Sequence, residues 1–239
     1  MKNFVITIPC RLNSKRFPEK LIKKYKGKEI FLHTYERCLK VTNKKNIYIL
    51  TDSSKIANIC KLNNVKFIRT RKNLITGSDR IASIKNKLRA KIYINVQGDE
   101  PIINPLDIKK LIKISKKNTS LTLNGFTQIS YDVAKRKSIP KVIMDKKNNL
   151  IYMSRNIIPY NYTNKLVKKK FYKQVCIYSY PYNVLKYFNN KKTFLEQNED
   201  IEILRLLENS VPIKMVKMSN KSFAIDLESD INKLKRLKN

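Results

Sequence analysis

The chain has 239 residues, 42% of them hydrophobic, and a formal net charge of +34 at neutral pH. A chain of this length can bury a core large enough to fold without disulfides or a structural metal. It has no run of about 18 apolar residues, and charge interrupts its first apolar stretch too early for a signal peptide. We therefore expect a cytoplasmic globular protein with no membrane insertion.

The cysteine pattern argues against a disulfide-rich protein and a zinc protein. Cys10, Cys38, Cys60 and Cys176 are widely spaced, no two of them form a CxxC pair, and His33 is the only imidazole. Zinc sites and disulfide frameworks need closer groups of ligands or paired cysteines. We expect reduced, mostly buried thiols and a structural His33.

The positive charge also invites a nucleic-acid-binding interpretation, because basic surfaces bind phosphate backbones. Lysine is nevertheless spread along the whole chain and greatly outnumbers arginine. The 13 Tyr and 9 Phe fall mostly in predicted strands and helices, where core packing explains them better than stacking on bases. We expect a solvated lysine surface with no specific nucleic-acid site. A basic nucleic-acid-binding protein is the alternative.

Strand-like and helix-like segments alternate through the first half of the chain. Apolar runs predict strands at 3–10, 46–52, 65–70 and 91–100. Helical spacing, with Ser or Pro near several starts, predicts helices at 30–40, 53–64, 78–89 and 105–117. Such alternation indicates a mainly parallel sheet between helices, with ligands bound at the carboxyl ends of the strands.

The second half has a more antiparallel pattern. Strands are predicted at 120–129, 141–145, 150–155, 171–180 and 213–218, with a hairpin turn at 145–149. Helices are predicted at 193–210 and 228–238. The sequence thus predicts an α/β fold with one mixed sheet flanked by helices, an antiparallel hairpin region, and a single domain over 1–239.

The loop after the first predicted strand is unusually basic. It carries Arg11, Lys15, Arg16 and Lys20 within ten residues. At the carboxyl edge of a parallel sheet, such cations suit a triphosphate, whose oxygens accept charge-assisted hydrogen bonds. In a chain so rich in lysine, a solvated charged loop is the alternative.

Two aspartates end apolar runs and are the candidate metal ligands. Asp99 stands at the acidic end of the strand at 91–100, and Asp226 precedes the last predicted helix. Mg²⁺ is usually held by one or two carboxylates plus phosphate oxygens. The alternatives are an acidic pair at a helix start for Asp99 and a helix cap for Asp226. Between the basic loop and Asp99, the segment 76–80 offers helix N-terminal amides to a nucleotide, although its motif is ordinary.

Several motifs together resemble those of the 3-deoxy-manno-octulosonate (Kdo) cytidylyltransferases, the CMP-Kdo synthetases. In chain order they are IPCRLNSKRFPEK, TGSDR, INVQGDEP, KVIMDKKNNLIYMSRNIIPY and AIDLESDI. The resemblance implies a nucleotide-diphospho-sugar transferase-like (Rossmann-like) fold, CTP and Mg²⁺, and a homodimer with its contact near 140–180. It also implies attack by the anomeric hydroxyl of an acidic 3-deoxy-ulosonic sugar on the α-phosphate, with loss of pyrophosphate, for lipopolysaccharide or surface polysaccharide synthesis.

The same resemblance assigns roles to individual residues. It implies a nucleotide-binding part at about 1–118 and a part for the sugar and the dimer contact at about 119–239. Catalytic roles fall to Arg11, Arg16, Lys20 and Asp99, and metal binding to Asp99 and Asp226. Nucleotide contacts fall to Arg11, Ser14, Lys15, Lys20, Gly77, Ser78, Arg80 and Gln97, and sugar contacts to Arg155, Gln174, Tyr178 and Glu202.

The chain departs from the family pattern mainly in the sugar half. Gln174 and Cys176 stand where the family has histidine and glycine, and Ile203 replaces a glutamine. Glu19 replaces a glycine in the first loop, and Leu74 stands near a common histidine. Because unmatched polar groups discriminate substrates sharply, amino-substituted Kdo or a sialic-acid-like sugar is an alternative acceptor. A protein that binds CTP without turnover is a third hypothesis.

Overall fold

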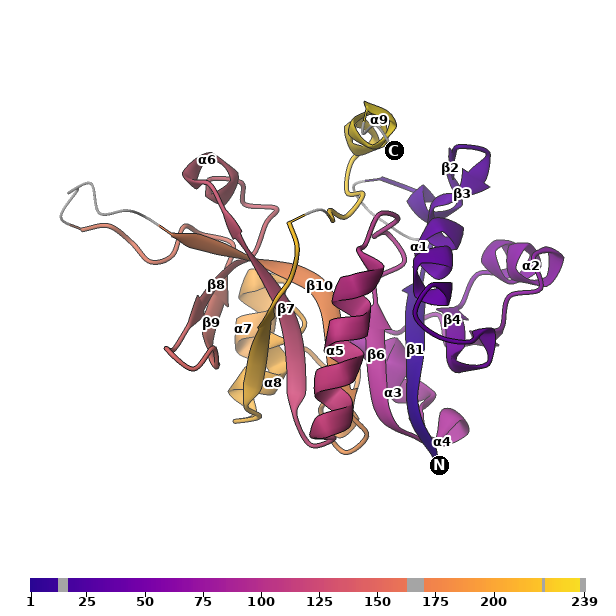
Figure 1. Ribbon diagram of the computed structural model, residues 1–239, viewed down its shortest axis with the longest axis horizontal. Coiled ribbons are helices and arrows are strands. Elements are labelled where there is room, and N and C mark those ends of the chain that lie inside the picture. Colours follow the sequence, from indigo (N-terminus) through magenta and orange to yellow (C-terminus); the bar gives the residue numbers. More distant parts are fainter. Residues whose placement is uncertain (13–16, 163–169, 221, 237–239) are drawn as a thin grey trace.

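The computed structural model describes residues 1–12, 17–162, 170–220 and 222–236. A nine-stranded sheet has the order β11-β7-β10-β6-β1-β4-β5, and β8 and β9 attach beside β10 (Figure 1). Its strands are β1 (Lys2–Cys10), β4 (Ile47–Thr51), β5 (Phe67–Arg69), β6 (Ala90–Val96), β7 (Thr122–Ile129), β8 (Lys141–Met144), β9 (Leu150–Ser154), β10 (Phe171–Pro181) and β11 (Ile213–Lys217). The short strands β2 (Lys24–Tyr25) and β3 (Lys28–Glu29) form a separate pair.

Helices connect most of these strands. They are α1 (Ile30–Leu39), α2 (Ser54–Leu62), α3 (Gly77–Ser83), α4 (Lys85–Leu88), α5 (Pro105–Lys117), α6 (Tyr131–Ala134), α7 (Phe194–Glu199), α8 (Leu204–Glu208) and α9 (Glu228–Arg236). Three 3₁₀ turns are η1 (Lys20–Ile22), η2 (Lys44–Asn46) and η3 (Val184–Tyr187). No helix in the described ranges is long and apolar enough to cross a membrane.

The sheet is parallel on one side and mixed on the other, which confirms the predicted fold class. β1 runs parallel to β4 and β6, whereas β10 lies antiparallel between β6 and β7. The ends of β1 and β6 therefore meet at one edge of the sheet. Val96 is paired with Ile177, so the chain that leaves β6 passes beside the middle of β10.

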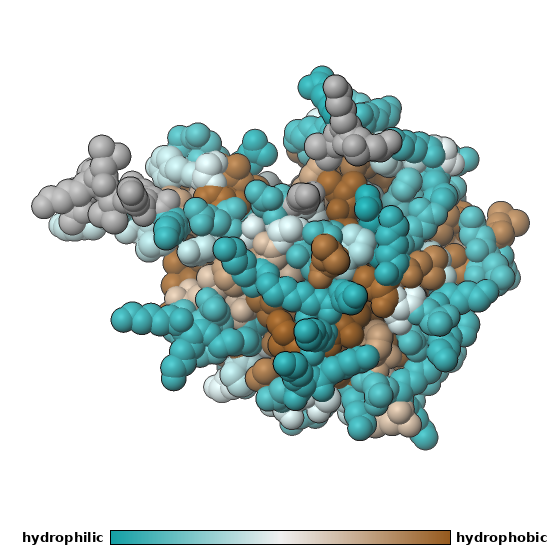
Figure 2. Space-filling view, in the orientation of Figure 1, coloured by the Kyte–Doolittle hydropathy of each residue, from teal (hydrophilic) through white to brown (hydrophobic). Residues whose placement is uncertain are grey.

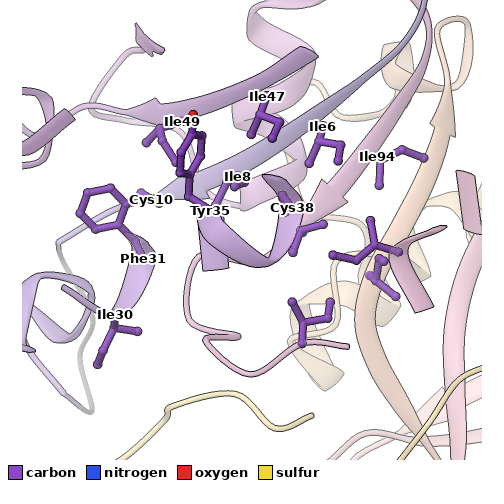
Figure 3. Close-up of a cluster of buried hydrophobic side chains, with 14 of the residues drawn as sticks. Ile6, Ile8, Cys10, Ile30, Phe31, Tyr35, Cys38, Ile47, Ile49 and Ile94 are labelled. Carbon is purple, nitrogen blue, oxygen red and sulfur yellow. The ribbon is translucent and has the colours of Figure 1, made fainter. Parts of the chain in front are cut away.

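The core consists of two apolar clusters, because side chains alternate between the two faces of each strand. Ile6 and Ile8 face the cluster that contains Phe31, Tyr35 and Cys38 of α1 (Figure 3). Val5 faces the other cluster, which α3, α8 and η3 cover. The predicted core thiols are free, and all except Cys176 are buried. Hydrophilic side chains project over much of the face shown in Figure 2.

The predicted hairpin is confirmed and its turn has a clear cause. β8 and β9 pair in antiparallel fashion on either side of 145–149. Asp145 Oδ1 accepts hydrogen bonds from the backbone N–H groups of Lys147 and Asn149 at 2.8 and 2.7 Å. Asn148 adopts the left-handed conformation that such a turn requires, which asparagine tolerates better than most residues.

The prediction of one helix over 193–210 is wrong. It divides into α7 and α8 at Asp200, which adopts a left-handed conformation with φ of 49°. Glu196 and Arg205 bind each other across this break. In a continuous helix they would be about two and a half turns apart and on opposite faces. The predicted helix at 78–89 likewise divides at Ile84 into α3 and α4.

Candidate active site

Three charged side chains converge above the ends of β1 and β6. Lys20 Nζ lies 2.5 Å from Asp99 Oδ2 and 3.5 Å from Asp226 Oδ1, and it donates to the backbone oxygen of Ile225 at 2.7 Å. Burial alone lowers the pKa of Lys20, but the two carboxylates outweigh it and the pKa is raised. The ammonium group is therefore charged, and it offsets one of the two negative charges of Asp99 and Asp226.

The backbone holds these groups together. The N–H of Ile225 donates to the carbonyl oxygen of Asp99 at 2.9 Å, which joins the segment before α9 to the loop after β6. Lys20 begins η1 directly after Glu19, which has a left-handed conformation with φ of 55°. The Glu19 carboxylate is turned to the surface, where it accepts a hydrogen bond from Lys55 at 2.6 Å. The family departure at Glu19 thus has its own cationic partner.

Asp226 directs its carboxylate to Lys20 and leaves the capping role to Asp230. Asp230 Oδ2 accepts from the backbone N–H groups of Asp226 and Leu227 at 3.0 and 2.9 Å. The alternative that Asp226 serves only as the cap of the last helix is therefore not needed. Its side chain lies at the edge of the sheet, 3.5 Å from Lys20 Nζ.

Close packing fixes the loop that carries Asp99. A Cβ atom on Gly98 would lie 2.7 Å from Cys10 Sγ and 3.1 Å from the Pro9 oxygen, so no larger residue fits. Thr34 Oγ1 donates to the Gly98 oxygen at 3.0 Å. The neighbouring Glu100 is 3% exposed, and burial raises its pKa to about 8, with a further contribution from Asp99. Its Oε2 has no hydrogen-bond partner within the described ranges.

Glu202 joins two of the predicted nucleotide-binding residues. Its Oε2 accepts from the backbone N–H of Ser78 at 3.1 Å, and its Oε1 accepts from Gln97 Nε2 at 3.2 Å. Ser78 Oγ lies 2.9 Å from Tyr180 Oη. A Cβ on Gly77 would lie 3.2 Å from Gln97 Nε2, so the start of α3 packs tightly against the end of β6. Glu202, predicted as a sugar contact, thus lies against the nucleotide side.

The two described arginines of the predicted nucleotide set differ in exposure. Arg11 is exposed and its Nη1 donates to the Ile75 oxygen at 2.9 Å. Arg80 is 2% exposed, and it contacts Thr70 and, at 3.4 Å, Asp52. Burial lowers the pKa of Arg80, although Asp52 opposes this effect. The remaining predicted residues of the first loop lie outside the described residues: Ser14, Lys15 and Arg16.

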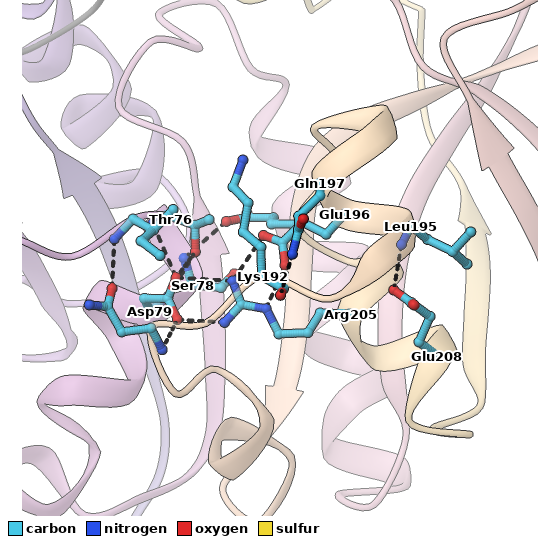
Figure 4. A network of polar contacts seen from close by, with 12 residues as sticks. Thr76, Ser78, Asp79, Lys192, Leu195, Glu196, Gln197, Arg205 and Glu208 are labelled. Carbon is cyan, nitrogen blue, oxygen red and sulfur yellow. Dashed lines mark hydrogen bonds and ion pairs between the residues drawn. The ribbon is translucent and has the colours of Figure 1, made fainter.

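A buried ion network supports the start of α3 (Figure 4). Arg205 Nη1 and Nη2 lie 2.6 and 3.2 Å from the Asp79 carboxylate, and Arg205 Nε and Nη2 lie 2.6 and 2.9 Å from Glu196. Asp79 also accepts from the N–H and hydroxyl of Thr76 and from the Asn190 N–H. Sequence reasoning missed this network. The T-x-x-D capping signal at 76–79 was the one available sign.

The predicted sugar residues occupy β10 and its surroundings. Gln174 is buried and donates to Asn124 Oδ1 at 2.9 Å. Tyr178 is buried and stacks on Tyr180, with ring centroids 5.6 Å apart. Arg155 lines a cavity of about 570 Å³, but its hydrogen bonds go to backbone carbonyls. The structure therefore brings Glu202 and Tyr178 near the nucleotide side, and places Arg155 between the end of α7 and the α6–β8 connection.

Cys176 lies between these groups. It belongs to β10 and lies where the pairing register of β10 with β7 shifts, between Val175 and Tyr178. Burial raises the pKa of its thiol, and four carboxylates around it raise it further: Glu100, Asp99, Glu202 and Asp226. Cys176 is thus a neutral group in the acidic floor of the site. Ile203, the other sugar-half departure, is fully buried in the second core cluster.

The donor set fits Mg²⁺ shared with a substrate. The described residues include no group of three or more His, Cys, Asp or Glu side chains that could hold a metal ion by themselves. Asp99 and Asp226 nevertheless share one cation, the Lys20 ammonium group. Mg²⁺ commonly takes only one or two carboxylates and completes its shell with water and phosphate oxygens. These two carboxylates are the residues that could hold it.

Comparison with known proteins gives matches along nearly the whole chain. A family model described as Cytidylyltransferase matches residues 5–235. The 3-deoxy-manno-octulosonate cytidylyltransferase of Chloroherpeton thalassium is 34% identical over 98% of this chain and 96% of the relative. The protein of the same name from Escherichia coli is 31% identical over 99% of this chain and 96% of its own length.

Solved structures give the same result. A CMP:2-keto-3-deoxy-manno-octonic acid synthetase complexed with CTP superposes with a TM-score of 0.90 at 31% identity, covering 98% of this chain and 97% of that one. The inositol-1-phosphate CTP transferase of T. maritima has a TM-score of 0.67 at 11% identity, covering 98% of this chain and 97% of its own, and so shares the fold alone.

Proposed function

This chain belongs to the cytidylyltransferase family, and we propose that it transfers CMP from CTP to the anomeric hydroxyl of Kdo or a close analogue. The convergence of Lys20, Asp99 and Asp226 at one sheet edge carries this proposal. These residues are far apart in the chain, and their types suit a metal-bound triphosphate. The product would serve lipopolysaccharide or surface polysaccharide synthesis.

The reaction needs little covalent chemistry from the protein. The anomeric hydroxyl loses its proton to water, its oxygen forms a bond to the α-phosphorus, the bond from that phosphorus to the bridging oxygen breaks, and pyrophosphate leaves. Lys20 and Arg11 neutralise the charge on the leaving group, and Arg16 is predicted to assist them. Mg²⁺, held by Asp99 and Asp226 with phosphate oxygens, would supply further charge neutralisation at the triphosphate.

The remaining residues bind and orient the substrates. The nucleotide part at about 1–118 contributes the start of α3, with Gly77 and Ser78, and Gln97 at the end of β6. The sugar part at about 119–239 contributes Gln174 and Tyr178. Because Gln174 is paired with Asn124, and Ile203 packs in the core, few polar groups remain for the sugar. The alternative acceptors, amino-substituted Kdo and a sialic-acid-like sugar, therefore belong in the same test.

A homodimer in the cytoplasm completes the proposal. The expected contact region, 140–180, exposes large apolar side chains: Ile151 at 55%, Tyr160 at 83% and Tyr162 at 88%. Apolar groups of this size favour association. Light scattering with size-exclusion chromatography should give twice the monomer mass, and a monomer at micromolar concentration would contradict this part.

Pyrophosphate release tests the function directly. The purified chain is mixed with CTP, Mg²⁺ and, separately, Kdo, amino-substituted Kdo and a nine-carbon sialic acid. We expect release with Kdo or its amino analogue and none without sugar. CTP binding without release for any sugar would favour the protein without turnover. Retention of nucleic acid on filters at physiological salt, with sequence preference, would favour the nucleic-acid alternative.

A further inference from the structure

We propose that Arg155 and Glu199 are positioning residues that hold the turn between α7 and α8, so that Glu202 stays in contact with Ser78 and Gln97. The inference rests on the proposed function for its kinetic consequence. It changes the role of Arg155, which the family resemblance assigns to the sugar. The contacts of four elements carry it: β9, α7, the α6–β8 connection and the start of α3.

The guanidinium group of Arg155 donates hydrogen bonds to backbone carbonyl oxygens. Its Nε donates to the Glu199 oxygen at 2.5 Å and its Nη2 to the Asp200 oxygen at 2.9 Å. Its Nη1 donates to the oxygens of Ser138 and Lys137 at 3.2 and 3.3 Å. These four bonds occupy most of the five N–H donors of an arginine. The side chain therefore joins the end of α7 to the α6–β8 connection and has little capacity left for a sugar carboxylate.

The Glu199 carboxylate in turn accepts hydrogen bonds from the end of β9 and the residue after it. Its Oε2 accepts from the backbone N–H of Arg155 at 2.7 Å, and its Oε1 accepts from Ser154 Oγ at 2.6 Å. The fully buried Lys141 donates to the Arg155 carbonyl oxygen at 2.5 Å. The end of β9 and the end of α7 are thus linked by reciprocal bonds, several of them to charged groups, which are the stronger kind.

The turn that follows is held at its other end by the buried network. Asp200 is left-handed, and Arg205, five residues later, is bound to Asp79 at the start of α3. Glu202 lies between these two anchors. The N–H groups of Leu204 and Arg205 donate to the oxygens of Ile201 and Glu202, and α8 begins at Leu204, two residues after Glu202. Little freedom remains for Glu202 while both anchors hold.

The position of Glu202 matters for the residues predicted to bind the nucleotide. The carboxylate of Glu202 accepts from the Gln97 amide, two residues before Asp99, and from the backbone N–H of Ser78 in the first turn of α3. A displacement of about 1 Å in such groups can reduce turnover by about 100-fold. Releasing the turn from Arg155 should therefore impair the reaction, although the hydrogen bonds of the Arg155 guanidinium go to backbone carbonyls.

Kinetics of matched variants test the proposal. Arg155→Lys and Glu199→Gln should each lower kcat/KM for the acid sugar by about ten-fold or more, and the double variant should lose no more than the worse single one, because both act through one turn. In a Glu202→Gln background neither change should add to the loss. Lys135→Met is the control: Lys135 lines the same cavity but pairs with the exposed Asp132, and it should behave as wild type.

A different pattern of results would contradict the proposal. If Arg155→Lys lowers kcat/KM by the same factor in the Glu202→Gln background, while Glu199→Gln has wild-type activity, Arg155 contacts the sugar and the proposal fails. Hydrogen exchange supplies a readout without turnover: amide exchange over 201–205 should rise in Arg155→Lys and Glu199→Gln and not in Lys135→Met. Unchanged exchange would overturn the proposal. A wild-type chain inactive with every sugar would count against the proposed function alone.

Discussion

Replacing Arg205 by methionine should destabilise the protein strongly, because it removes the cation from a fully buried network. The side chains of Arg205, Asp79 and Glu196 are 1%, 0% and 1% exposed. Removing one partner of a buried ion pair typically costs about 3–5 kcal/mol, since the remaining charge has no solvent. Asp79 keeps its bonds from Thr76 and Asn190, so most of the loss should come from Glu196.

Urea unfolding measures this loss. At pH 7 the free energy of unfolding of Arg205→Met should fall by about 3–5 kcal/mol at unchanged m value. For a chain of this size, that corresponds to a melting temperature about 6–20 °C lower. Lys233→Met is the matched control, because the Lys233 side chain is 54% exposed and Asp230 keeps its hydrogen bonds from the N–H groups of Asp226 and Leu227. It should change the free energy by about 0.5 kcal/mol or less.

The loss of stability in Arg205→Met should also depend on pH. Burial raises the pKa of Asp79, but the bonds from Arg205 and Thr76 outweigh it and the pKa is lowered. A depressed folded pKa contributes stability above the unfolded value of about 3.9, and this stability is lost as pH falls through the folded value. Arg205→Met lacks the part of this contribution that Arg205 supplies to Asp79. The difference in unfolding free energy between the two proteins should therefore narrow as pH falls below about 4. A gap under 1 kcal/mol, or one independent of pH, would refute this reasoning.

Three further changes probe the site. Asp99→Asn should lower the rate of pyrophosphate release at least about 100-fold, because the residue acts on metal and phosphate, while the melting temperature stays within a few degrees. Near-normal activity would contradict the assignment of Asp99 as a metal ligand. Lys20→Ala should raise KM for CTP more than KM for the sugar, and equal effects would argue against a triphosphate role. Gly98→Ala should cost about 1–3 kcal/mol because its Cβ meets Cys10 Sγ at 2.7 Å, and Cys10→Ala should partly restore stability in the double variant.

Local patterns in the sequence determined most of the secondary structure and the neighbourhood of the site. Alternating apolar runs and amphipathic segments predicted the parallel half, and the Asp145 turn predicted the hairpin of β8 and β9. The placement of Asp99 at a strand end followed from the same patterns. These features depend on interactions between residues near one another in the chain, which sequence periodicity reports directly.

Only the tertiary structure decided which charges meet. Lys20 binds Asp226 across 206 residues and Arg205 binds Asp79 across 126, and neither pairing has a local signal. The break at Asp200 has the same origin, since it brings Glu196 and Arg205 to one side and Glu202 onto Ser78. A buried cation requires an anionic partner, which can come from a distant part of the chain. This requirement can outweigh the helical propensity of the segment to which the cation belongs.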